Sequence, residues 1–147
     1  MTIAVTGTGL DRVYPATNRA LARRIADSGL LVSEFPLGTQ PARGNFPRRN
    51  RIIAGLSTAT LVVEAARASG SLITARLASA AGREVFAMPG SIHNPLARGC
   101  HQLIRDGAKL VETTEHIIEE IAAVLPGYRA APRPAESHPQ TSEMPEQ

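Results

Sequence analysis

The sequence predicts an α/β fold, a Rossmann-like parallel β-sheet with helices on both faces. Short apolar runs recur along the chain without polar alternation, which is typical of strands covered on both faces. Segments with helical start and stop signals separate these runs. Alternating strands and helices of these lengths favour a parallel sheet, because each crossover helix returns the chain in the same direction.

The expected strands are short, partly β-branched and rich in aliphatic residues. They lie at residues 3–5, 30–32, 60–63, 84–88 and 109–111. Helices are predicted between them from punctuating residues: a proline near the start of the first, a glycine after each of the first three, and a threonine before the last. These helices are expected at 15–28, 70–81, 99–106 and after Thr113 or Thr114.

The chain divides into one compact domain, residues 1–125, and a tail, residues 126–147. The tail is rich in Pro, Ser, Glu and Gln and has few large aliphatic residues, so we expect it to be disordered. No apolar run is long enough for a transmembrane helix, and the N-terminus lacks the pattern of a signal peptide. We therefore expect a cytoplasmic protein with no membrane partner.

Arginine supplies nearly all of the positive charge, and Lys109 is the only lysine. Arginines gather between positions 43 and 51, whereas acidic residues gather between 112 and 120. This asymmetry is the footprint of a nucleic-acid-binding protein, although a genomic bias toward arginine codons would also produce the composition. A lone cysteine, Cys100, and scattered histidines give no metal-ligand spacing, so no metal site and no cofactor are expected.

Two segments have the chemistry to hold phosphate. Arg48, Arg49 and Arg51 offer guanidinium groups that fit phosphate oxygens. About twenty residues later, the turn 69–71 opens a helix whose N-terminal N–H groups favour anions. Both segments are expected near the carboxyl ends of strands, where such sheets bind ligands. Their separation indicates a polyanion.

Several longer motifs resemble the DNA-processing protein A (DprA/Smf) family over about residues 2–120. The motifs are Gly7-Thr8-Gly9-Leu10-Asp11 with Tyr14-Pro15 and Asn18, Ser33-Glu34-Phe35-Pro36, Phe46 to Leu56, Val63-Glu64-Ala65, Ser69 to Ala75, Gly82 to Ala87 with Pro89-Gly90, and Gly99-Cys100 with Leu103-Ile104 and Gly107-Ala108. The resemblance implies a Rossmann-like, homodimeric, single-stranded DNA-binding protein without enzymatic activity. It also implies protection of incoming DNA during natural transformation and loading of the RecA recombinase.

On this resemblance the site residues can be assigned to roles. Arg49 and Arg51 would contact phosphates, although one of them could instead pair with an acidic side chain, and Asn50 would fix the loop. Phe46 would either stack on a base or anchor the core. The DNA-binding set is Phe46, Arg49, Asn50, Arg51, Ser69, Gly70, Ser71 and Thr74.

The serine turn has two compatible interpretations. Ser69, Gly70 and Ser71 would donate N–H and hydroxyl groups to a phosphate, with the Thr74 hydroxyl one turn further, and Ser69 is also a normal helix cap. The resemblance places a dimer interface at His101, Leu103 and Ile104. The alternative for that segment is a half-exposed surface helix.

Two acidic residues, Glu34 and Glu64, lie near strand ends, where paired carboxylates could carry out acid–base chemistry. We expect them instead to pair with the arginines.

A second hypothesis is a nucleotide-cleaving enzyme, because the fold also resembles that of the LOG-type phosphoribohydrolases. Leu77 lies where those enzymes carry their catalytic glutamate, which argues against this activity.

The sequence departs from the DprA/Smf pattern in one respect. The family's Rossmann-like domain has an earlier half with a Gly-Ser-Arg motif and a further Gly-rich turn, and neither occurs here. The chain therefore resembles the later part of that domain. We expect an exposed sheet edge and weakened DNA binding as consequences.

Overall fold

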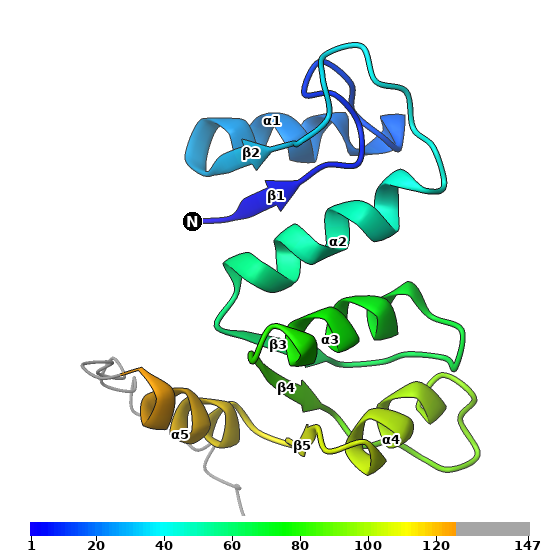
Figure 1. The fold of residues 1–147 in the computed structure, drawn as a ribbon, viewed down its shortest axis with the longest axis vertical. Helices are drawn as coiled ribbons and strands as arrows, with labels where there is room; N and C mark the ends of the chain where they lie inside the picture. Colours follow the sequence, from blue (N-terminus) through cyan, green and yellow to red (C-terminus); the bar gives the residue numbers. More distant parts are fainter. Residues whose placement is uncertain (126–147) are drawn as a thin grey trace, which may run out of the picture.

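The computed structural model describes residues 1–125, in which short strands alternate with helices (Figure 1). The elements in chain order are β1 (Ile3–Val5), η1 (Ala16–Asn18), α1 (Arg19–Ser28), β2 (Leu30–Val32), α2 (Asn45–Leu56), β3 (Ala59–Val62), α3 (Gly70–Ala80), β4 (Glu84–Ala87), α4 (Arg98–Arg105), β5 (Lys109–Leu110) and α5 (Thr114–Val124). The predicted tail, 126–147, lies outside the described residues.

Every strand pair in the described residues is parallel, which confirms the predicted fold class. The strands form two separate sheets, one of order β1-β2 and one of order β3-β4-β5. Helices flank both: α1 packs on β2, α2 on β1, α3 on β3 and β4, and α4 on β4. Helix α2 also packs along α3 and lies between the two sheets (Figure 1).

The predicted elements agree with the structure within a residue or two, with two differences. The first predicted helix, 15–28, is divided into η1 and α1. Helix α2 was absent from the predicted helices, because its residues give little apolar periodicity and only Ala54 is buried. Its start is nevertheless favourable, since Pro47 in the first turn has no N–H that would otherwise need a partner.

The hydrophobic core lies between the three-stranded sheet and helices α2, α3 and α4. Its residues are mostly small, which allows the helices to approach the sheet closely. They are Ala54, Val62, Ala65, Leu72, Ala75, Ala78, Val85, Ala87, Cys100 and Leu103.

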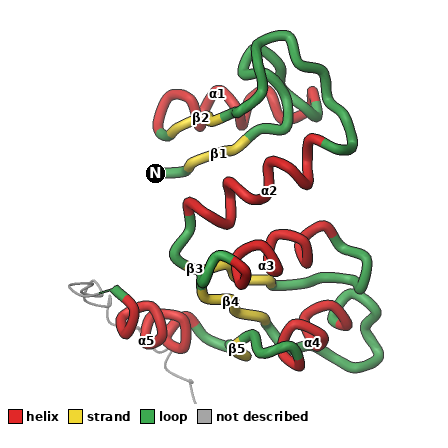
Figure 2. The backbone as a smooth tube through the Cα atoms, in the orientation of Figure 1, coloured by secondary structure: helices red, strands yellow, loops and turns green. Residues whose placement is uncertain are grey.

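The parallel arrangement brings the loops that matter for function to one side of the molecule. The loops that follow β1, β2, β3 and β4 gather on the right in Figure 2, and α2 and α3 begin on that same side. Carboxyl ends of parallel strands share one edge, where α/β proteins bind ligands. The candidate site is therefore expected there.

Gly99 allows the closest contact between α4 and the loop after β3. Its N–H donates to the Ala65 carbonyl at 2.7 Å, and a Cβ on Gly99 would lie 2.5 Å from that oxygen. Gly55, inside α2, has no atom within 4 Å of its equivalent position. The two helical glycines should therefore respond to the same substitution in opposite ways.

We predict that Gly99→Ala lowers the free energy of unfolding by about 1–3 kcal/mol, because the helix must move away from Ala65. Gly55→Ala is the matched control and should raise it by roughly 0.5–1 kcal/mol, since alanine restricts the unfolded chain at an open helical position. Urea unfolding followed by circular dichroism measures both. Equal effects of the two changes would contradict the packing argument.

The Cys100 thiol should be unreactive in the folded protein. It is 1% exposed, and burial raises its pKa, so the thiol remains protonated at neutral pH. We expect labelling by Ellman's reagent to be slow in buffer and fast in urea. A native rate equal to that of the unfolded chain would show that this face of α4 is not packed against the core.

Candidate nucleic-acid interface

The loop after β1 is joined by side chains to two other segments. The Ser33 hydroxyl donates to the Thr8 carbonyl at 2.7 Å, and the Thr6 hydroxyl donates to the same oxygen at 2.9 Å. From the start of α2, the Asn45 amide donates to the Gly7 carbonyl at 2.9 Å. The ends of β1 and β2 and the start of α2 thus form one connected unit.

Gly9 is required by the close approach of backbone in this loop. A Cβ there would lie 2.6 Å from the Pro36 carbonyl and 2.5 Å from an Asp11 carboxylate oxygen. That carboxylate in turn accepts from the Gly38 N–H at 2.8 Å. The Gly-Thr-Gly run therefore has a structural role in holding the two loops together.

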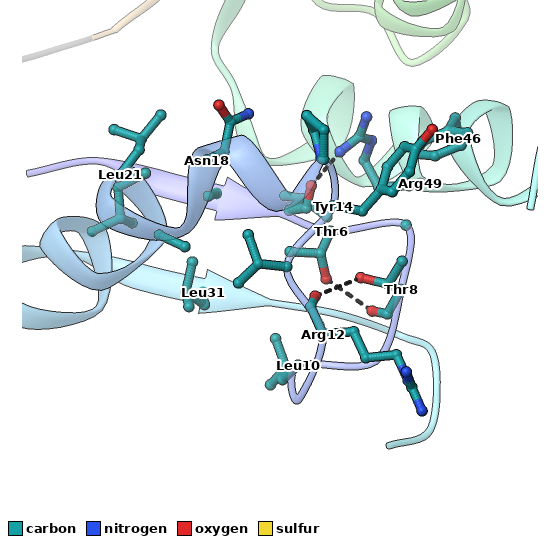
Figure 3. Close-up of a pocket in the computed structure, with 17 residues that line it drawn as sticks. Thr6, Thr8, Leu10, Arg12, Tyr14, Asn18, Leu21, Leu31, Phe46 and Arg49 are labelled. Atoms are coloured by element: carbon teal, nitrogen blue, oxygen red, sulfur yellow. Dashed lines mark hydrogen bonds between the residues drawn. The ribbon is translucent and has the colours of Figure 1, made fainter. Parts of the chain in front are cut away.

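A pocket of about 310 Å³ opens beside this unit. Its wall from α1 is apolar, with Leu21 and Ile25, whereas the first turns of α2 contribute Phe46 and Arg49. Tyr14, Phe46 and Arg49 lie together at one part of the rim (Figure 3). The pocket thus combines an aromatic, cationic rim with an apolar interior.

Arg49 is the central side chain of this rim. Its Nη1 donates to the Val5 carbonyl, its Nε donates to Asn50 Oδ1 at 3.0 Å, and its guanidinium carbon lies 5.9 Å from the centre of the Phe46 ring. Burial lowers the pKa of Arg49, but an arginine side chain remains charged at neutral pH. Asn50 therefore orients the Arg49 cation, whereas its predicted role in fixing the loop stays a prediction.

Arg48 and Arg51 have different surroundings. Arg51 donates to a Glu34 carboxylate oxygen, which confirms that Glu34 pairs with an arginine, and the Arg51 side chain is 59% exposed. The Arg48 guanidinium lies 5.4 Å from the Phe35 ring centre. The similar expectation for Glu64 is wrong, because within residues 1–125 that carboxylate forms no ion pair and accepts from the Asn94 amide at 3.4 Å.

Phe46 is partly buried and already has aromatic and backbone neighbours. Its ring centre lies 5.7 Å from that of Tyr14 at 36° between the planes, and a Cβ on Gly7 would meet the ring at 3.1 Å. These contacts support the anchoring role. Base stacking by the remaining surface stays a prediction.

The serine turn forms the N-terminus of α3. Ser69 is the N-cap, and its hydroxyl oxygen accepts from the Ser71 N–H at 3.3 Å. Gly70 and Ser71 are exposed, and Thr74 lies half-buried one turn further. The capping role is confirmed, and phosphate binding by this turn stays a prediction.

Helix α4 carries the three residues predicted for a dimer interface. Leu103 is 6% exposed within the core, and Ile104 packs against that core. His101 Nε2 lies 2.8 Å from the Gly90 carbonyl. Leu103 therefore has almost no surface for a partner, and the predicted interface now depends on the half-buried His101 and Ile104.

Sequence reasoning left several site residues without a role. Tyr14 and Asn18 line the pocket, Thr8 is 2% exposed, and Asn45 ties α2 to the first loop. These uncharged residues gave no electrostatic signal, although Tyr14 and Asn18 fall within the first family-like run. In residues 1–125 no helix could span a membrane, and no three His, Cys, Asp or Glu side chains form a metal-binding group.

Comparison with known proteins identifies relatives over most of the chain. The profile of the DNA recombination-mediator protein A family matches residues 1–122. Protein Smf of Escherichia coli is 54% identical over 122 residues, which are 82% of this chain and 33% of that protein. The chain thus spans about a third of that relative's length.

Two solved structures are also similar. The crystal structure of DNA processing protein A from Streptococcus pneumoniae has a TM-score of 0.78 at 51% identity, covering 81% of this chain and 42% of that one. The protein of the same name from Helicobacter pylori, described for its single-stranded DNA binding mode, has a TM-score of 0.76 at 29% identity, covering 84% and 57%. Together with the profile match, these similarities show that the chain belongs to the DNA recombination-mediator protein A family, the DprA/Smf proteins.

Proposed function

We propose that this chain binds single-stranded DNA at the edge formed by the strand ends. The observation that carries the proposal is the Arg49 guanidinium held beside the Phe46 ring at the rim of the pocket. A cation beside an aromatic ring suits a single strand, because phosphates need positive charge and unpaired bases stack on aromatic faces. The Helicobacter pylori relative, described for binding single-stranded DNA, supports the same ligand.

In this proposal the arginine side chains contribute unequally to DNA binding. Arg51 already has Glu34 as a counter-ion, so a phosphate there must compete with a carboxylate. Arg48 and Arg49 have no ion pair among the described residues and keep their full charge for the ligand. The Ser69–Ser71 turn, which begins α3 on the same side of the molecule, would hold a further phosphate.

The wider role follows the family resemblance. We include in the proposal the protection of incoming DNA in natural transformation, RecA loading, homodimer formation and a cytoplasmic location. Binding without catalysis is favoured over nucleotide cleavage, since Leu77 packs against the core where a phosphoribohydrolase would need a glutamate. Glu34, the other candidate carboxylate, is bound by Arg51.

We predict that the full chain binds a fluorescein-labelled oligothymidylate with an affinity that falls steeply with salt. Each neutralised phosphate should add roughly −0.7 to the slope of log K against log salt concentration. Fluorescence anisotropy across a salt series measures this slope. Absence of binding at low salt by a sample that is folded by circular dichroism would refute the proposed function for this chain.

We predict that Arg49→Ala weakens oligonucleotide binding about tenfold or more, because a charged hydrogen bond to the ligand is lost. Arg24→Ala removes the same charge from an exposed position on α1 and should bind nearly as tightly as the parent. Since Arg49 also binds the Val5 carbonyl, urea unfolding of each variant must show that the compared samples are folded. Equal weakening by both changes would mean that overall charge, and not this site, binds DNA.

A further inference from the structure

Helix α2 meets the ends of β1 and β2 with two different faces. Residues three apart in a helix lie on the same face. Phe46 and Arg49 form such a pair at the end of β1, where Arg49 donates to the Val5 carbonyl. This is the face on which the proposed function depends.

The other face of α2 lies against the loop after β2. Arg48 and Arg51 are again three residues apart, and each contacts one residue of that loop. Arg51 donates to the Glu34 carboxylate, and the Arg48 guanidinium carbon lies 5.4 Å from the centre of the Phe35 ring. The edge of the sheet thus carries a second pair of an arginine and an aromatic ring.

Backbone contacts fix Phe35 to the same loop as Phe46. The Phe35 N–H donates to the Ser33 hydroxyl oxygen at 3.1 Å, and that hydroxyl donates to the Thr8 carbonyl at 2.7 Å. The Phe46 ring lies against this loop as well, since a Cβ on Gly7 would be 3.1 Å from the ring. The loop after β1 therefore positions both rings, and a ligand that binds rings already in place loses less ordering entropy.

The charges around Phe35 favour an anion. The Glu34 carboxylate precedes the ring and would repel a phosphate, but Arg51 pairs with it. Arg48 is exposed and forms no ion pair among residues 1–125, so its charge is available to a ligand. The Phe35 side chain is half-buried, which leaves part of the ring accessible. A nucleotide needs this combination, because a cation binds its phosphate and a ring stacks on its base.

We propose that Phe35 and Arg48 form a second nucleotide subsite, so that a single strand has two of its bases held, one at each arginine–aromatic pair. This inference rests on the proposed function, because both subsites would hold the same strand. Arg48 and Arg49 are consecutive residues with Cα atoms about 3.8 Å apart, so the phosphates that they bind would belong to nearby nucleotides. Aromatic stacking accepts any base, so the second subsite adds affinity with little sequence preference.

A purely structural role for this pair leads to a different expectation. If Arg48 served only to cover the Phe35 ring, its substitution would change the stability of the fold and leave DNA binding as it is. Loss of a base-stacking ring, in contrast, weakens the binding of strands that carry bases and leaves the binding of a bare sugar–phosphate chain unchanged.

The test compares oligothymidylate with an abasic strand of the same length, which has the same phosphates and no bases. Fluorescence anisotropy of the full chain at low salt measures both affinities. Phe35→Leu keeps an apolar side chain and removes the ring, so it should weaken oligothymidylate binding about tenfold and leave the abasic strand unaffected. Phe35→Tyr keeps a ring and is the matched control, which should bind both strands as the parent does.

The cation is tested by Arg48→Gln across a salt series. This variant should bind both strands more weakly, and the slope of log K against log salt concentration should become shallower by roughly 0.7, because one phosphate contact is lost. Arg24→Gln makes the same change at an exposed position on α1 and should leave the slope unaltered.

Nuclear magnetic resonance of the unmodified chain gives a measurement that needs no variant to fold. The chain has three phenylalanines, and Phe86 is fully buried. With labelled phenylalanine, the ring signals of Phe35 and Phe46 should shift on addition of oligothymidylate and stay in place with the abasic strand. The Phe86 signals are the internal control and should not move with either strand.

Each outcome decides one question. The second subsite is wrong if Phe35→Leu weakens both strands equally or neither, if Arg48→Gln leaves the slope unchanged, or if the Phe46 signals shift while those of Phe35 do not. Any of these results alongside binding by the parent leaves the proposed function intact. Binding of neither strand by the folded parent refutes the proposed function, and the second subsite with it.

Discussion

The contact between the Arg49 guanidinium and the Val5 carbonyl links the two halves of the structure. It joins α2 to the open edge of β1, and α2 packs along α3, which lies on the other sheet. An unpaired carbonyl on a buried residue such as Val5 costs about 1–3 kcal/mol, so this edge needs a donor. The donor that fulfils this structural need is also the cation at the rim of the pocket. The stability of the β1 edge and the positive charge at the rim of the pocket therefore depend on one side chain.

The arginine cluster is less uniform than its sequence suggests. Arg51 is compensated by Glu34, Arg48 lies against Phe35, and Arg49 is held by Val5 and Asn50. Counting charges in the sequence treats these side chains as equal. Arg49 is therefore a cation held by the protein, and Arg48 is an exposed cation beside a ring. Arg51 is half of an exposed ion pair, which contributes little to stability.

The sequence was sufficient for the features that depend on local chemistry. Apolar runs predicted the strands, the serine at position 69 predicted the cap of α3, and charge order predicted that Glu34 pairs with an arginine. Features that depend on contacts between residues far apart in the sequence could not be predicted from it. Helix α2 lacks a wide apolar stripe, and the partner of Glu64 comes from a loop thirty residues later. Leu103 was predicted to contact a partner subunit, yet its side chain is buried in the core.

The division into two sheets could be anticipated only in part, because an open edge follows from the missing family motifs but its position follows from register. The division of the strands into two sheets sets a geometric requirement for the site. Arg49 belongs to the β1 side and the serine turn to the β3 side, so the spacing between them is set by whatever joins the sheets. Helix α2 spans that distance through its contacts with β1 and α3. A polyanion gains most from two binding groups whose spacing is fixed before it arrives, since less ordering entropy is then lost on binding. The packing that holds the two sheets together and the affinity for a phosphate chain are for this reason coupled properties of the same edge.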